Sequence, residues 1–238
     1  MNRSAFTVSA RRKFGSTLFM LFKIILCLLP WSLRRWLLRR SFGYEIDPSA
    51  RIGLAWVFPK KLRMGKNSHI GHFTVAIHLD ALELGDFSTI GRSNWITGYP
   101  SDGREYFTHQ TERRPRLIVG EHSAITKHHY LDCTHEIRIG KFTTIAGHHS
   151  ELLTHAIDIV AGRQDSKPIE IGDYCFVSTR CVILSGAKLP AQSVLAAGAV
   201  LNKAFAETYS LYGGVPAKKI KELPHDARYF HREVGFVK

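Results

Sequence analysis

The chain has 238 residues, a hydrophobic content of 45% and a formal net charge of +13 at pH 7. This length suits one elongated domain with terminal segments, and the excess of positive charge indicates an anionic partner such as nucleic acid, a membrane surface or a phosphorylated ligand. No RNA-binding signature accompanies the charge, so we expect no nucleic-acid partner. The spacing of the cysteines fits neither a zinc knuckle nor a small disulfide scaffold, which favours a reducing compartment. The cysteines are Cys27, Cys133, Cys175 and Cys181.

Residues 1–43 are predicted to form a basic segment that is first apolar and then amphipathic. Phe14–Leu29 is apolar but contains Lys23, and it is shorter than the roughly 20 residues of a spanning helix. Trp31–Arg40 combines tryptophan and arginine, as in helices that lie on anionic lipid. We expect residues 1–40 to attach the protein to the inner face of the cytoplasmic membrane. A cap on the open end of the domain, or a spanning or signal segment, remains an alternative.

Residues 44–203 carry an aliphatic side chain at every sixth position through most of their length. The clearest run is Ile171, Val177, Ile183, Leu189, Leu195 and Leu201, and a small residue follows each of the first five after four positions. This spacing matches neither a strand nor a helix, but it is typical of a parallel β-helix, in which three short strands form a coil of about eighteen residues. A single coil cannot bury its own aliphatics, so the coils must stack.

The repeat also predicts which residues begin each coil and where the chain leaves it. The expected coil starts, which should lie above one another, are Met64, Leu84, Val119, Ile139, Ile171 and Leu189. Extra residues at 97–117 and 152–168 should form two loops that leave the β-helix at one corner. Long loops on a rigid scaffold often carry function, although a purely solvated excursion is the alternative. Residues 204–238 should form a C-terminal extension with a short helix.

Two C-terminal passages, Leu195–Lys203 and Tyr212–Ile220, resemble the end of the hexapeptide-repeat acyltransferases. The order of the upstream motifs Leu131–Asp132, Thr154–Asp158 and Ile169–Asp173 is similar to that of the maltose, galactoside and nodulation-type O-acetyltransferases. The basic N-terminus looks more like the polysaccharide O-acetyltransferases. The resemblance implies an all-β, left-handed parallel β-helix that forms a homotrimer and binds acetyl-CoA between subunits. It implies transfer of an acetyl group to a sugar hydroxyl in cell-surface polysaccharide or glycolipid synthesis, without a metal.

The same resemblance assigns the candidate site residues. His155 matches the catalytic histidine, which would act as a general base on the sugar hydroxyl. Asp158 could orient the imidazole, bind a substrate hydroxyl or only cap the loop. Asp132 matches an aspartate of the family, although a corner turn explains it as well. The positions expected to bind acetyl-CoA are Thr179, Ala197, Asn202, Lys203 and Lys218.

One departure leaves the acceptor open, and two other functions remain possible. The acceptor-side asparagine of the family is missing, and Lys127, His128 or His129 could replace it. Three histidines at positions where small residues are expected, His129, His135 and His149, suggest a zinc-dependent, carbonic-anhydrase-like enzyme, although their spacing does not match. A noncatalytic membrane-associated scaffold is the third possibility.

Overall fold

The computed structural model describes residues 17–103 and 105–237. Residues 17–28 and α2 (Trp31–Phe42) are helical, and the remainder is built of short strands apart from a 3-10 helix, η1 (Arg228–His231). The basic residues Arg11, Arg12 and Lys13 of the expected N-terminal segment lie outside this part of the chain. Within it, neither helix has the length and apolar character that crossing a bilayer requires.

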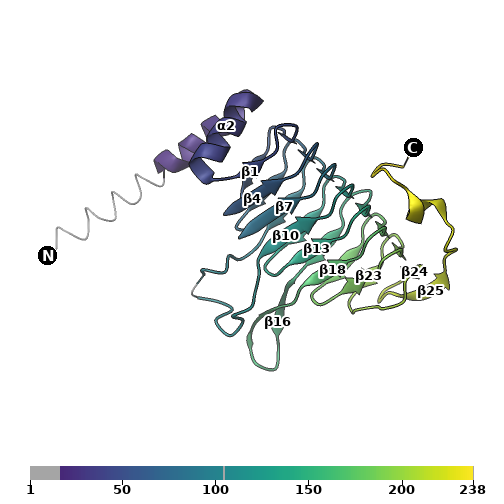
Figure 1. The fold of residues 1–238 in the computed structure, drawn as a ribbon. Coiled ribbons are helices and arrows are strands. Elements are labelled where there is room, and N and C mark those ends of the chain that lie inside the picture. The colour runs from purple at the N-terminus through teal and green to yellow at the C-terminus, as the bar shows by residue number, and fades with distance from the viewer. Residues whose placement is uncertain (1–16, 104, 238) are drawn as a thin grey trace.

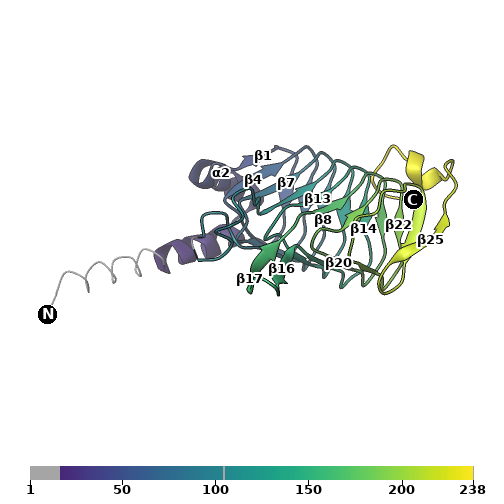
Figure 2. The same cartoon turned by 90° about the horizontal axis from the view of Figure 1, so that it is seen from below.

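The strands stack into three parallel sheets that form the sides of a prism, as Figures 1 and 2 show. The first sheet contains β1 (Glu45–Ile46), β4 (Lys61–Met64), β7 (Ala81–Leu84), β10 (Arg116–Val119), β13 (Ile137–Ile139), β18 (Ile169–Ile171) and β21 (Lys188–Leu189). The second contains β2 (Arg51–Ile52), β5 (His69–Ile70), β8 (Thr89–Ile90), β11 (Ala124–Ile125), β14 (Thr144–Ile145), β19 (Phe176–Val177), β22 (Val194–Leu195), β24 (Ser210–Gly213) and β25 (Lys218–Glu222). The third contains β3 (Trp56–Phe58), β6 (Val75–Ile77), β9 (Trp95–Thr97), β12 (Tyr130–Asp132), β15 (Glu151–Leu153), β20 (Val182–Leu184) and β23 (Val200–Leu201).

The register of the first sheet confirms the predicted coil starts. Met64 pairs with Leu84, Leu84 with Val119, and the series continues through Ile139 and Ile171 to Leu189. Each of these side chains is buried in one continuous core. The expected fold, a left-handed parallel β-helix of hexapeptide repeats, is therefore confirmed.

Small residues four positions after the aliphatics occupy the corners because they satisfy backbone groups there. Ser123 Oγ donates to the Gly140 carbonyl at 2.6 Å, and Thr143 Oγ1 donates to the Gly172 carbonyl at 2.7 Å. Cys175 fills an equivalent slot, and burial raises the pKa of its thiol to about 12, so it is a small core residue.

A glycine that follows the aliphatic allows successive coils to approach. A Cβ on Gly71 would lie 2.6 Å from the carbonyl carbon of Gly91, on the next coil. No real side chain tolerates that contact with backbone, so the repeat requires glycine at this position.

Helix α2 covers the N-terminal end of the β-helix (Figure 1). Leu38 is fully buried in the core, and Arg34 is 2% exposed. The Arg34 guanidinium donates to the carbonyls of Gly53 and Ala55, both at 2.7 Å, and so satisfies acceptors that the first coil leaves without a neighbouring strand. Helix α2 therefore caps the N-terminal end of the β-helix, which is one of the alternatives that the sequence leaves open for residues 1–43.

Two excursions leave the β-helix between a strand of the third sheet and the next strand of the first sheet. Residues 98–115 leave after β9 and residues 154–168 leave after β15, so both depart from the same corner. The second excursion is an antiparallel hairpin of β16 (His155–Asp158) and β17 (Arg163–Ser166) that projects from the prism (Figures 1 and 2).

Stacking continues beyond Lys203, where the six-residue period ends. β24 pairs with β22, and Tyr212 fills an interior position with its hydroxyl donating to the Glu207 carbonyl at 2.6 Å. β25 then turns back antiparallel to β24. The following tail returns along the coils, where the Tyr229 hydroxyl donates to the Cys175 carbonyl at 3.1 Å.

Candidate active site

His155 begins the projecting hairpin and lies between two polar side chains. Its Nδ1 is 3.8 Å from Asp132 Oδ2, at the end of β12. On the other side, its Nε2 forms a short hydrogen bond with Gln164 Oε1 from β17. The ring of Phe107 contacts it edge-on, with 5.5 Å between centroids. The side chain of His155 remains 39% exposed, so it is held on three sides and still accessible.

The open side of His155 faces a cavity of about 260 Å³. Its walls come from the ends of β9 and β12 and from both excursions. The lining residues are Thr97, Gly98, Tyr99, Tyr106, Phe107, Asp132, Thr134, His155 and Gln164. The cavity is small, and its mixed aromatic and polar lining is typical of small-ligand sites.

Gln110 joins the two excursions. Its Nε2 donates to Asp165 Oδ1 at 2.7 Å and to the Ser166 carbonyl at 3.0 Å, and Ser166 Oγ donates to Gln110 Oε1 at 2.7 Å. The two excursions are far apart in sequence, but these hydrogen bonds join them into one wall of the cavity.

Arg113 fixes the base of the first excursion. Only 6% exposed, it donates to the carbonyls of Thr134 at 2.7 Å and Pro100 at 2.9 Å. Its guanidinium also packs over the Phe107 ring at 4.6 Å. Because Phe107 contacts His155, Arg113 holds the aromatic wall of the cavity in place.

The hydrogen bond to Gln164 determines what His155 can do. A glutamine carbonyl oxygen only accepts, so in this contact a neutral His155 carries its proton on Nε2, and Nδ1 is its basic nitrogen. Nδ1 lies 3.8 Å from Asp132 Oδ2, and both residues line the cavity. A neutral imidazole held in this way can take a proton from a hydroxyl group that enters the cavity.

Asp158 does not contact His155. Its carboxylate accepts the Ala161 backbone N–H at 3.0 Å and lies 3.9 Å from Arg163 Nε, within the hairpin turn. The two residues are three positions apart on β16, and strand alternation directs their side chains to opposite faces. Asp132 is therefore the carboxylate next to the histidine, and Asp158 stabilises the turn.

The expected acetyl-CoA residues divide between two edges of the prism. Thr179 and Ala197 lie on successive coils between the second and third sheets, where the Gly198 N–H donates to the Thr179 carbonyl at 3.1 Å. Lys218 follows the next coil, opposite Gly213. Asn202 and Lys203 lie instead after β23, at the corner from which His155 departs. Within one chain, the third sheet separates the two groups.

The three histidines considered for zinc are dispersed. His129 is 2% exposed and has both nitrogens in use, since Ser150 N–H donates to Nδ1 at 3.1 Å and Nε2 lies 2.9 Å from Thr126 Oγ1. Burial, reinforced by His148, lowers the pKa of His129 to about 4. His135 Nδ1 accepts the Glu136 N–H at 2.7 Å. Among the residues that the structure describes, no three histidine, cysteine or acidic side chains are grouped to hold a metal.

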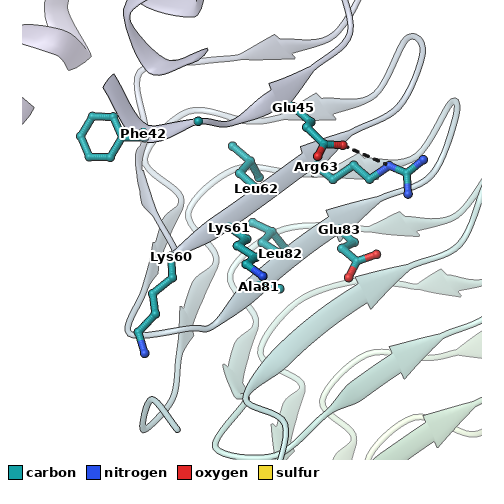
Figure 3. Close-up of a pocket in the computed structure, with 10 residues that line it drawn as sticks. Phe42, Glu45, Lys60, Lys61, Leu62, Arg63, Ala81, Leu82 and Glu83 are labelled. Atoms are coloured by element: carbon teal, nitrogen blue, oxygen red, sulfur yellow. Dashed lines mark ion pairs between the residues drawn. The ribbon is translucent and has the colours of Figure 1, made fainter. Parts of the chain in front are cut away.

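A second, larger groove lies on the outer face of the first sheet beside the end of α2 (Figure 3). It measures about 540 Å³, and Lys60, Lys61 and Arg63 project from it beside Glu45 and Glu83. Arg63 Nε is 3.9 Å from Glu45 Oε2. This groove offers mutually compensating charges and no imidazole, so the cavity at His155 is the better candidate despite its smaller volume.

Known proteins share this architecture. No protein-family model matches the chain. A polysialic acid O-acetyltransferase, OatWY, superposes with a TM-score of 0.55 at 17% identity, over 78% of this chain and 90% of that chain. The D94N mutant of AntD, an N-acyltransferase from Bacillus cereus solved with dTDP and coenzyme A, gives a TM-score of 0.50 at 10% identity, over 82% of this chain and 92% of that chain. The chain thus has the β-helical fold on which these two acyltransferases are built.

Proposed function

We propose that this protein is an acetyl-CoA-dependent O-acetyltransferase that acts on a sugar hydroxyl in cell-surface polysaccharide or glycolipid synthesis. The observation that carries the proposal is His155, which lines a cavity of about 260 Å³ with Nε2 bound to Gln164 and Nδ1 3.8 Å from Asp132 Oδ2. The likeness to two acyltransferase structures supports it, one an O-acetyltransferase and one solved with coenzyme A.

In the proposed reaction, His155 moves a single proton. Nδ1 takes the proton of the sugar hydroxyl as its oxygen attacks the thioester carbonyl of acetyl-CoA. When the carbon–sulfur bond breaks, the imidazolium returns that proton to the leaving thiolate. Asp132, 3.8 Å from Nδ1, stabilises the imidazolium between the two transfers.

The residues expected at the acetyl-CoA site fit that molecule in charge and access. Ala197 is exposed at a corner, so its backbone can be approached closely. Lys203 and Lys218 are exposed, and neither forms an ion pair with an acidic group of the described residues, so both are available for phosphate. Since the Ala197 edge and the His155 edge are separated in one chain, we propose that they meet between subunits of a homotrimer.

Calorimetry with acetyl-CoA tests the function directly. We expect saturable binding that Lys203→Ala or Lys218→Ala weakens by about tenfold, because each removes one phosphate contact. Lys61→Ala, at the opposite end of the prism, should leave binding unchanged. The same sample should transfer labelled acetyl to one or more saccharides in an acceptor screen.

Two results would contradict the proposal. Absence of acetyl-CoA binding with one zinc per subunit would support the carbonic-anhydrase-like alternative. Absence of both ligands would support a noncatalytic scaffold.

We further propose that the N-terminal helices attach the protein to an anionic membrane. Apolar side chains on residues 17–28 remain exposed, including Leu21 at 50% and Ile25 at 57%, and Trp36 on α2 is 60% exposed. Arg35, Arg39 and Arg40 line a shallow hollow beside Trp36. Exposed apolar surface next to arginine suits the boundary of a bilayer that contains acidic lipids.

Two variants separate membrane attachment from capping. Leu21→Asp/Ile25→Asp should reduce sedimentation with vesicles of phosphatidylcholine and phosphatidylserine by at least about tenfold, without lowering the melting temperature, because both side chains are exposed. Arg34→Leu should lower the free energy of unfolding by about 2–3 kcal/mol, because the Gly53 and Ala55 carbonyls lose a charged donor, and should still bind vesicles.

Unchanged sedimentation of the double aspartate variant would contradict attachment through this helix. Arg39 is an exposed arginine of α2, the helix that contains Arg34, so Arg39→Ala is the stability control for Arg34→Leu. It should change the free energy of unfolding by less than about 0.5 kcal/mol.

A further inference from the structure

The edge between the second and third sheets carries a column of basic side chains. Backbone hydrogen bonds place these residues on consecutive coils: Ser93 N–H donates to the His72 carbonyl at 2.9 Å, His128 N–H to Arg92 at 3.2 Å, and His149 N–H to His128 at 2.8 Å. Successive coils are about 4.8 Å apart. We call this column the basic edge, and its members are His72, Arg92, Lys127, His128 and His149.

The charge of the basic edge is not neutralised within the described residues. All five side chains are exposed, and no acidic group of the described chain forms an ion pair with Arg92 or Lys127. The rings of His128 and His149 lie 5.9 Å apart, so basic groups face one another along the column. The fixed charges of Arg92 and Lys127, with imidazole groups beside them, favour an anionic ligand with more than one charge.

Two strands lead from the basic edge to the cavity at His155. β9 and β12 begin beside Arg92 and Lys127, and they end at Thr97 and Asp132, which line the cavity. Three strand residues span about 10 Å, which is longer than one sugar ring. A molecule that reaches both sites is therefore a chain of several units.

Aromatic side chains cover the path between the two sites. Trp95 and Tyr130 are register partners on β9 and β12, and they are 50% and 38% exposed on the outer face of the third sheet. Exposed aromatic rings side by side offer an apolar platform for the faces of sugar rings. The basic edge, the aromatic pair Trp95 and Tyr130, and the cavity at His155 therefore lie in this order along β9 and β12.

We propose that the basic edge binds the acidic part of the acceptor, a saccharide chain with carboxylate or phosphate groups, while one of its sugar units enters the cavity at His155. This assignment rests on the proposed acetyltransferase function and specifies its substrate class. A saccharide is favoured over a nucleic acid as the ligand, because β9 and β12 lead to His155, where a hydroxyl group of the ligand would be activated. Neither Lys127 nor His128 then replaces the missing asparagine in the cavity, since both lie at the other end of β12.

Binding of labelled tetrasaccharides tests the proposal. We expect tetragalacturonate, or a phosphate-linked mannose tetramer, to bind at least about ten times more tightly than neutral maltotetraose, and to weaken as salt is added. Comparison of the two acidic probes distinguishes carboxylate from phosphate. Arg92→Gln/Lys127→Gln should weaken binding of the acidic tetramer by about tenfold, which corresponds to about 0.7 kcal/mol for each of the two exposed charges.

The matched control is Lys61→Gln/Lys66→Gln, which removes the same charge from exposed positions outside the basic edge. It should leave binding within about twofold. Equal binding of acidic and neutral tetramers, equal effects of the two double variants, or tighter binding of a thymidine tetranucleotide would each overturn the proposal.

Acetyl-CoA binding by the same variants separates the two levels of inference. Normal acetyl-CoA binding without preference for acidic tetramers would overturn the acceptor assignment and leave the acetyltransferase function intact. Binding of acidic tetramers by a protein that binds no acetyl-CoA would overturn the acetyltransferase function, and with it the role of the chain as an acceptor.

Discussion

Replacing His155 by alanine is expected to lower kcat for acetyl transfer by about two to four orders of magnitude, the range that a positioned general base contributes. The variant should bind acetyl-CoA within about threefold of the unaltered protein, because His155 lines the cavity proposed for the acceptor and is not one of the residues proposed to hold acetyl-CoA. Its melting temperature should be unchanged, since the side chain is 39% exposed on a projecting hairpin. Initial rates with labelled acetyl-CoA give the measurement.

The control for His155 is His225→Ala, an exposed imidazole near the C-terminus, for which we expect ordinary activity. Gln164→Leu is the informative companion, because it removes the acceptor that holds Nε2–H while leaving the imidazole in place. We expect a smaller loss of kcat, since the imidazole remains but is no longer held in one orientation. Full activity of a folded His155→Ala protein would refute the assignment of the base.

Mixing two inactive variants should restore about one quarter of the activity if the site forms between subunits. Ala197→Arg places a bulky cation on the exposed edge proposed for acetyl-CoA, and His155→Ala removes the base from the other edge. In randomly mixed trimers, a site that takes one edge from each of two neighbours is intact when both happen to be unaltered. Each edge is unaltered in about half of the subunits, which gives the one-quarter value.

The control mixture combines His155→Ala with the doubly substituted His155→Ala/Ala197→Arg chain. No subunit then supplies the base, so activity should stay at background. If the first mixture also stays at background after mixing is verified by mass spectrometry, the two edges act within one subunit and the trimeric arrangement is refuted.

The six-residue period was sufficient to predict the β-helix and the stacking of its coils. The inward direction of each aliphatic, such as Ile139 or Ile171, follows from the alternation of side chains along a strand and from the small residues at the corners. Stacking then pairs these aliphatics between neighbouring coils. The period also located the two excursions at the corner between the third and first sheets, because extra residues between coil starts must leave the prism. His155 was selected on other grounds, from the resemblance of the motif Thr154–Asp158 to the hexapeptide-repeat acyltransferases, and this motif lies at the start of the second excursion.

The partners of His155 depended on the tertiary structure. The sequence suggested Asp158, three residues away, but strand alternation turns it to the opposite face, and Asp132 from an earlier coil takes the position beside the imidazole. Gln164 contacts Nε2 because of the register of the β16–β17 hairpin, and no local sequence motif predicts the turn of that hairpin.

The capping role of Arg34 and the alignment of Arg92 with Lys127 likewise arise from contacts between segments distant in sequence. The sequence by itself determined the repeating scaffold, because a period of neighbouring residues encodes it. Only the folded chain decided which side chains meet on that scaffold, because loop geometry and the register between coils bring them together.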